Sequence, residues 1–319
     1  MDDWYRCVGL SAEIAYRYHM SFQPTRGGFD RDRRSFRYYR NAVERHWDPH
    51  DIDLSRDREA IAALPKPVFD GLRETLALFG AGEEAVTKDL APLAVVLVDV
   101  ADQLFLTTQL YEEAKHADFF DRYWERVIAP EERRRGLEPS SPADDRWFSE
   151  AYDELFARNE AAMAHLLEDD GPEARAEAYC HYHMTIEGIL AQTGYYGVQM
   201  EFSGELDGIP ELPGLVEGFT KIRGDEGRHI GFGMWKLKRL IDDEGVDPTH
   251  VRSLVGELAM LTQEIVADAR SDEGPGIDDA SLIAYAAEKH ADRMAQLVDD
   301  AIEFPSIEEL VRLEDRDTH

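Results

Sequence analysis

Two Glu-x-x-His pairs in this chain have the residue types and the spacing of metal ligands. Glu113 is followed by His116, and Glu226 by His229. Residues three apart on a helix project from the same face, so the carboxylate and the imidazole of each pair point to one place beside the helix. Carboxylate and imidazole ligands suit iron and manganese. Each pair therefore predicts two ligands of a metal site.

Two further glutamates interrupt apolar stripes of predicted helices. Leu76 and Phe79 lead at helical spacing to Glu83, and Glu187 lies beside Ile186. An ionised carboxylate inside a helical core is costly unless another charge compensates it. A bound metal ion is the natural compensating charge.

Together these residues follow the order Glu, Glu-x-x-His, Glu, Glu-x-x-His on four separate predicted helices. This is the ligand inventory of di-iron and di-manganese carboxylate bundles. Four carboxylates neutralise the charge of two divalent ions, and the sequence thus predicts a dinuclear site built from Glu83, Glu113, His116, Glu187, Glu226 and His229. Spacing alone does not exclude the neighbouring Glu84 and Glu112.

Helical periodicity begins near Pro67 and continues to residue 302, which predicts one all-α domain covering 1–319. Within it we expect an N-terminal arm and short helix at 1–50, a bundle at 67–302 and a tail at 303–319. The arm includes a basic helix at 31–46, and a loop follows at 47–57. The predicted bundle helices span 67–97, 98–128, 144–168, 172–202, 213–243, 248–271 and 278–302, with a kink at Pro92 and a stop at Pro130.

Composition limits the possible partners. The chain has 35 Lys and Arg against 66 Asp and Glu, a formal charge of −31. Such a surface repels nucleic acid and anionic membranes, and it suits a very salty cytoplasm in which ions screen the self-repulsion. Cys7 and Cys180 form no CxxC pair, and we interpret Cys180 as a small buried hydrophobe. No signal peptide or membrane-length apolar run is present, so we expect a cytoplasmic protein.

Several sequence motifs are familiar: GFDRD at 28–32, WDPHDIDLSRD at 47–57, AGEEAV at 81–86, EEAKH at 112–116, YHMTIEG at 182–188 and RGDEGRHIGFG at 223–233. With them the chain resembles the ribonucleotide reductase small-subunit superfamily of ferritin-like folds. Within that superfamily it is most similar to the ligand-binding oxidases. The resemblance implies a ferritin-like bundle, a homodimer, and the six residues above as ligands of manganese and iron or of two irons.

Two further positions match the ligand-binding oxidases. That branch has a valine three residues after the first ligand and a tyrosine five residues before the third-helix glutamate, and this chain has Val86 and Tyr182 there. The resemblance implies an ether cross-link between them, formed by O₂ activation at the metals. It also implies a long-chain fatty acid bound beside the metals. A core tyrosine bonded to a glutamate or histidine is the alternative reading of Tyr182.

Other positions bear on the choice between oxidase and reductase subunit. Phe120 stands where reductase subunits carry their radical tyrosine, and the C-terminal LVRLEDRDTH lacks their aromatic docking tail. Trp47 and Asp225 match the reductase electron-relay positions, although Asp225 could simply orient a ligand histidine. We therefore favour an O₂-activating oxidase of C–H bonds, with an unknown electron donor. The alternatives are a radical-generating reductase subunit and a non-enzymatic ferritin-like metal-binding bundle.

The remaining polar and aromatic residues near these motifs have simpler readings. We interpret His181 and His183 as residues behind the ligands or on a helix face, because the ligand set is already full. Tyr195, Tyr196 and Trp235 fit core or dimer contacts. Gly80 and Gly82 could break the helix to admit substrate or permit close packing, and the sequence favours neither.

Overall fold

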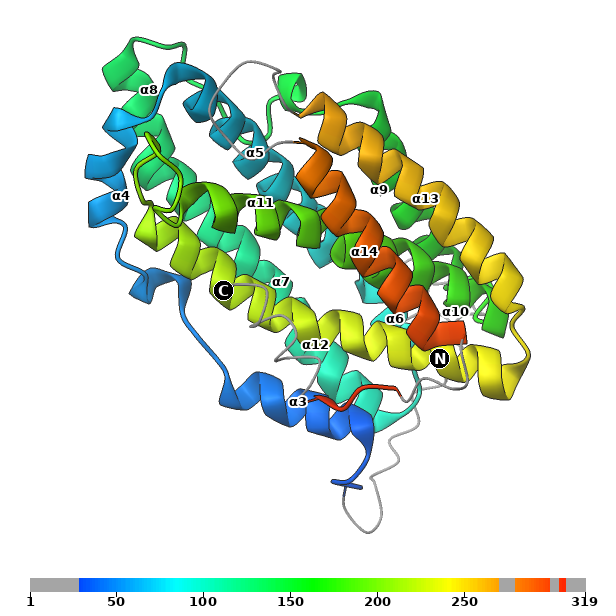
Figure 1. Cartoon of the computed structure of the whole chain (residues 1–319). Coiled ribbons are helices and arrows are strands. Elements are labelled where there is room, and N and C mark those ends of the chain that lie inside the picture. Colours follow the sequence, from blue (N-terminus) through cyan, green and yellow to red (C-terminus); the bar gives the residue numbers. More distant parts are fainter. Residues whose placement is uncertain (1–28, 270–278, 299–303, 308–319) are drawn as a thin grey trace, which may run out of the picture.

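The structure, a computed structural model, describes residues 29–269, 279–298 and 304–307 (Figure 1). Within these ranges the chain forms helices joined by turns and loops, and no strand. The predicted all-α architecture is confirmed. Most of the predicted arm before residue 30 and of the tail after 303 lies outside the described residues, and the division of the chain into one domain stays a prediction.

Four long helical segments form the centre of the bundle (Figure 1). Three are single helices, α5 at Lys66–Asp89, α7 at Val100–Tyr123 and α12 at Pro213–Glu244. The fourth is a continuous run of α10 at Pro172–Tyr179, η5 at Cys180–Ala191 and α11 at Gln192–Phe202. α5 packs against α7, and α12 packs against η5 and α11. Two clusters of buried hydrophobic residues fill the space between them.

The middle of the fourth segment, η5, is a π-helix, which periodicity did not predict. Here the Thr185 hydroxyl donates to the carbonyl of Cys180 five residues earlier, at 2.8 Å. A Cβ on Gly188 would lie 2.8 Å from the carbonyl oxygen of His183, so only glycine fits this turn. Rare π segments occur often at functional sites. This one carries Glu187 and Tyr182.

Two prolines act differently from our prediction. Pro92 does not kink a long helix, because α5 ends at Asp89 and Pro92 lies in the first turn of the separate helix α6, Ala91–Val96. Pro130 does not stop the next helix either. α7 continues through a π turn at Trp124–Ile128 into α8 at Ala129–Arg135, and Pro130 lies in the first turn of α8, where no backbone N–H is needed.

The outer helices cover the central four. They are α3 at Arg34–Glu44, α9 at Glu150–His165, α13 at Pro248–Asp268 and α14 at Asp279–Val298. α3 packs along α7, while α13 and α14 pack on η5 (Figure 1). No helix in the described part of the chain is long and apolar enough to cross a membrane.

The predicted loop at 47–57 is wrong in part, because it contains short helices at Pro49–Asp51 and Ser55–Ala60. The second of these, α4, is held by its buried Asp57. The Asp57 carboxylate accepts hydrogen bonds from the backbone N–H groups of Gly214 and Leu215, each at 2.8 Å, and from the Tyr123 hydroxyl at 3.0 Å. Asp57 therefore caps the first turn of α12 from a distant part of the sequence.

We predict that Asp57→Ala lowers the free energy of unfolding by about 2–3 kcal/mol, because buried N–H groups at the start of α12 lose a charged acceptor. Asp53→Ala is the matched control. The Asp53 carboxylate is exposed and accepts from the backbone N–H of Ser55 at 2.9 Å, and its loss should lower the free energy of unfolding much less than the loss of Asp57. Denaturant unfolding measures both, and equal losses would contradict the capping role.

Candidate metal centre

The structure brings together all six predicted ligands at the centre of the bundle. They form two overlapping groups. In each group every residue offers one nitrogen or oxygen atom, and these atoms all lie within 4.8 Å of one another. Glu83, Glu113, His116 and Glu226 make up the first group, and Glu113, Glu187, Glu226 and His229 make up the second. All six side chains are buried. Because Glu113 and Glu226 belong to both groups, they lie where they could bridge two ions.

In the first group, the Nδ1 atom of His116 faces the carboxylates. It lies 3.3 Å from Glu226 Oε1 and 3.5 Å from an oxygen of Glu83 and of Glu113. The other ring nitrogen, Nε2, lies 3.1 Å from Asp225 Oδ2. A carboxylate behind a metal-binding imidazole fixes the tautomer and the orientation of the ring. Asp225 holds His116 in this way.

The second group repeats the arrangement. His229 Nδ1 lies 3.0 Å from Glu113 Oε1, 3.3 Å from Glu226 Oε2 and 3.4 Å from Glu187 Oε1. Its Nε2 lies 2.9 Å from Glu112 Oε2. The position of Glu112 settles an ambiguity of the sequence, because its carboxylate lies behind His229 and outside the six-residue cluster.

Glu84, the other ambiguous neighbour, points to solvent and pairs with Lys88 at 2.9 Å. The two glycines of this stretch allow close packing within an unbroken α5. A Cβ on Gly82 would lie 3.2 Å from the Phe156 ring and 3.3 Å from the Tyr152 hydroxyl oxygen, and one on Gly80 would lie 3.4 Å from Phe120 Cβ. The alternative of a helix break here is wrong.

The cluster fits the chemistry of a dinuclear site. The Nδ1 atoms of both histidines and one oxygen each of Glu187 and Glu226 are buried without a hydrogen-bond partner. Such orphaned polar atoms are rare and costly in a folded protein, and an unplaced ion is one of their ordinary explanations. These four atoms belong to residues of the ligand cluster, and four carboxylates supply the charge that two divalent cations require.

The pKa shifts of the cluster also indicate that its buried carboxylates lack compensating positive charge. Burial raises the pKa of Glu83 to about 8 and that of Glu187 well above its usual range. Burial acts against ionisation of Glu113 too, but His229 and His116 hold its pKa well below the usual range. In the absence of cations, the carboxyl groups with raised pKa values therefore hold protons. Metal binding must release these protons.

The carboxylates behind the two histidines share one arginine. Arg228 is fully buried and donates from its NH2 group to Glu112 at 2.6 Å and to Asp225. Asp225 also accepts from Lys115 Nζ at 2.7 Å and Trp47 Nε1 at 2.8 Å. Burial opposes its charge, yet Arg228, His116 and Lys115 hold the pKa of Asp225 far below its usual range. Asp225 is therefore an anionic acceptor for His116.

Trp47 extends this network away from the cluster. Its ring stacks on His116 with centroids 6.2 Å apart and planes 16° apart. Lys115 Nζ lies 4.3 Å from the Trp47 ring centre. Trp47, Asp225 and His116 thus form the contiguous chain of hydrogen bonds that the sequence resemblance implies.

Gln109 is a residue that sequence analysis missed. It is fully buried, and its Nε2 donates to Glu187 Oε1 at 3.0 Å and to Glu113 Oε1 at 3.4 Å. His183 Nε2 lies 3.5 Å from Gln109 Oε1, and burial lowers the pKa of His183 to about 3, so its ring is neutral. Gln109 lies one turn before Glu113. A glutamine at that spacing on a buried helix face is the sequence feature that could have indicated its role.

His181 lies apart from the ligand cluster, with its Nδ1 2.9 Å from the carbonyl oxygen of Glu177 on its own helix. His183, in contrast, contacts Gln109 behind the cluster. Neither histidine belongs to the two groups of candidate ligands in the described residues.

Tyr182 and Val86 lie in the same buried hydrophobic cluster. The Tyr182 hydroxyl donates to Glu113 Oε1 at 2.7 Å, and burial raises the pKa of this tyrosine well above its usual range. It is therefore a neutral phenol whose oxygen contacts a candidate ligand. Val86 follows Glu83 by one turn of α5 and is 4% exposed.

Phe120 packs against other aromatic rings. Its ring stacks on Phe79 at 5.4 Å and meets the edge of Phe219 at 5.5 Å. Phe79 also stacks on Tyr195, with ring centroids 5.1 Å apart. Tyr195 is buried, as expected for a tyrosine of the core. Tyr196 instead stacks on Tyr285 at 4.2 Å, where α11 meets α14, and Trp235 packs on Phe232.

Comparison with known proteins gives matches over most of the chain. The family model of the ribonucleotide reductase small chain matches residues 31–306. A tyrosine-to-phenylalanine variant of an R2-like ligand-binding oxidase with an aerobically reconstituted Mn/Fe cofactor is 30% identical. Its TM-score is 0.74, and the match covers 88% of this chain and 98% of that one. The R2-like ligand-binding oxidase from Sulfolobus acidocaldarius is 25% identical, with a TM-score of 0.71 over 92% of this chain and 99% of that one.

We predict that Gln109→Leu weakens metal binding at the His229 side by at least about tenfold, because Glu187 and Glu113 lose a buried donor that positions them. Gln103→Leu is the control: it is the same substitution on the same helix, and it removes a bond to the Leu97 carbonyl at 2.8 Å instead. Metal content after dialysis against a graded chelator measures the effect. Two ions per chain retained equally by both variants would contradict it.

Proposed function

Since the chain belongs to the ribonucleotide reductase small-chain family and, within it, to the R2-like ligand-binding oxidases, we propose that it is an O₂-activating oxidase with a Mn/Fe or Fe/Fe centre. Members of this group are metal-dependent oxidoreductases with a ferritin-like all-α fold, and this chain is one of them. The observation that carries the proposal is the convergence of six buried side chains, four of which have a buried polar atom without a hydrogen-bond partner.

In the proposed centre, Glu83 and His116 would hold one ion and Glu187 and His229 the other, and Glu113 and Glu226 belong to both groups of candidate ligands. When bound, the ions supply the redox chemistry that reduces O₂ and oxidises a C–H bond. The protein keeps the imidazoles oriented through Asp225 and Glu112. Mn/Fe-reconstituted relatives support the choice of metals.

The buried wall of the centre suits oxidation of an apolar molecule. Phe105, Val86 and Ile186 belong to the hydrophobic cluster that also contains Tyr182. Apolar walls exclude water, so a reactive centre is shielded from competing solvent reactions. Because the relatives are ligand-binding oxidases, we propose a long-chain fatty acid or a similar apolar molecule as the ligand.

We further propose that Tyr182 and Val86 become joined by an ether bond. The reaction breaks the O–H bond of Tyr182 and one C–H bond of the Val86 side chain and forms one C–O bond. Two protons and two electrons leave, and O₂ is the acceptor of the electrons. The short contact of the Tyr182 hydroxyl with Glu113 supports this step, because the carboxylate can take up the phenolic proton.

The Trp47–Asp225–His116 chain favours a second candidate, a radical-generating subunit for ribonucleotide reduction. Such a subunit must exchange an electron with a large partner through a continuous route. In this protein Phe120, packed among aromatic rings, cannot hold a tyrosyl radical, so the oxidant would have to be centred on the metals. Binding of a reductase large subunit discriminates between the two functions.

We predict that protein loaded with manganese and iron loses two hydrogens in mass after exposure to air, because the ether bond replaces one O–H and one C–H bond. Peptide mass spectrometry should find Tyr182 and Val86 in linked peptides. Tyr182→Phe should abolish the mass loss. Tyr179→Phe, which removes a buried hydroxyl without a hydrogen-bond partner three residues earlier, should retain it.

An unchanged mass despite full metal occupancy would remove the cross-link from the account. The reductase-subunit reading would then gain support, while the metal centre itself would stand.

A further inference from the structure

We propose that the outer face of α3, with Tyr111 of the adjoining α7, is the docking surface of a small acidic electron-carrier protein. We call it the α3 surface and define it by Phe29, Arg31, Arg37, Arg40, Val43 and Tyr111. The proposal rests on the oxidase function proposed above, since an oxidase that reduces O₂ needs a source of electrons.

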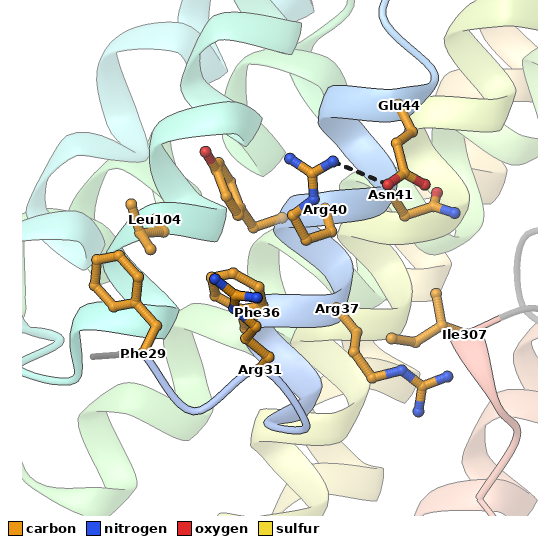
Figure 2. Close-up of a pocket in the computed structure, with 10 residues that line it drawn as sticks. Phe29, Arg31, Phe36, Arg37, Arg40, Asn41, Glu44, Leu104 and Ile307 are labelled. Atoms are coloured by element: carbon orange, nitrogen blue, oxygen red, sulfur yellow. Dashed lines mark hydrogen bonds and ion pairs between the residues drawn. The ribbon is translucent and has the colours of Figure 1, made fainter. Parts of the chain in front are cut away.

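Charge is the first observation. Residues 29–45 contain six arginines and three acidic residues, in a chain whose formal charge is −31. Arg33 and Arg40 are paired, with Asp99 and Glu44 respectively, each at 2.9 Å. Arg31 and Arg37 are exposed too, and both line the groove described in the next paragraph (Figure 2). An acidic protein is repelled by most of this molecule and attracted here, which fixes where and how it docks.

Shape and composition are the second observation. A groove of about 680 Å³ runs along α3, with Phe36, Tyr39 and Leu104 among its apolar lining residues (Figure 2). Phe29, Val43 and Tyr111 are 49%, 43% and 53% exposed, and they are three of the seven large hydrophobic residues exposed in the described ranges. Aromatic side chains mixed with arginine are typical of the energetic centre of protein interfaces.

Location is the third observation and selects the kind of partner. His46 and Tyr111 lie in ring contact at 5.8 Å, and Lys115 Nζ lies 6.0 Å from the Tyr111 ring and 4.3 Å from the Trp47 ring. Trp47 in turn donates to Asp225, which lies 3.1 Å from His116. A route of direct contacts therefore joins the α3 surface to the candidate metal centre. Electron transfer slows steeply with distance, so this face is favourable for a redox partner.

The electron count defines the carrier. Each docking event would oxidise one carrier by one electron. If the centre held two ions in the +3 state, two such events would supply the two electrons that bring both to the +2 state. A one-electron carrier such as an acidic iron–sulfur protein satisfies this balance, and no proton or atom needs to cross the interface.

The test uses reduced plant-type [2Fe–2S] ferredoxin, an acidic one-electron carrier, with the full chain in metal-free and metal-loaded form. Arg31→Glu with Arg37→Glu should weaken ferredoxin binding at low ionic strength by at least about tenfold, because two attractive contacts become repulsive. Lys66→Glu with Arg126→Glu is the matched control. It changes the net charge equally at exposed positions on α5 and the π turn after α7, and it should alter binding by less than about twofold.

Stopped-flow oxidation of the ferredoxin by the loaded protein gives a second readout. Trp47→Phe should leave the dissociation constant unchanged but slow this oxidation, since the phenyl ring lacks the N–H that donates to Asp225. Added salt should weaken wild-type binding through screening, while the apolar contacts retain part of it.

Three results would overturn the docking proposal. The first is equal binding of ferredoxin by the arginine variant and its control, and the second is that neither ferredoxin nor the acidic carrier flavodoxin binds the wild type at low salt. The third is a shift in sedimentation which shows that the arginines join two copies of this chain. Binding to the metal-free protein does not depend on oxidase chemistry. Arginine-dependent binding without any cross-link would therefore remove the proposed oxidation and leave the docking surface standing.

Discussion

The burial of four carboxylates and two imidazoles in one apolar bundle is the constraint on which the rest of this structure depends. An isolated charge of this kind costs several kcal/mol in a protein interior. The chain places positive partners one layer further out, with Arg228 and Lys115 beside Asp225. Yet the inward-facing Nδ1 atoms of His116 and His229 have no hydrogen-bond partner. A fold arranged in this way is completed by cations at its centre.

The outer layer makes the two halves of the centre chemically different. Behind His116, Asp225 is tied to Trp47 and so reaches toward the surface under α3. Behind His229, Glu112 bonds to the wholly buried Arg228, and Gln109 adds a neutral donor to Glu187. One half is thus connected to the exterior and the other is enclosed. Such asymmetry suits a centre that receives electrons on one side and holds two different metals.

Sequence reasoning recovered the all-α class and all six residues of the cluster, because a carboxylate on an apolar stripe is visible from its spacing. It could not exclude Glu84 beside Glu83 or Glu112 beside Glu113, because only packing shows that Glu84 points to solvent and that Glu112 lies behind His229. It missed the π-helix at Cys180–Ala191 because 3.6-residue periodicity has no signature for one inserted residue. It also missed Gln109, whose role depends on helices far apart in sequence. The expected pairing of Tyr182 with Val86 came from the resemblance and not from periodicity.

Anomalous X-ray diffraction from crystals of the protein reconstituted with manganese and iron, measured at both absorption edges, tests the central claim most directly. We expect two ions per chain about 3.5–4 Å apart, both contacted by Glu113 and Glu226, with His116 bound to one ion and His229 to the other. A single ion, or two ions that do not share these carboxylates, would contradict it.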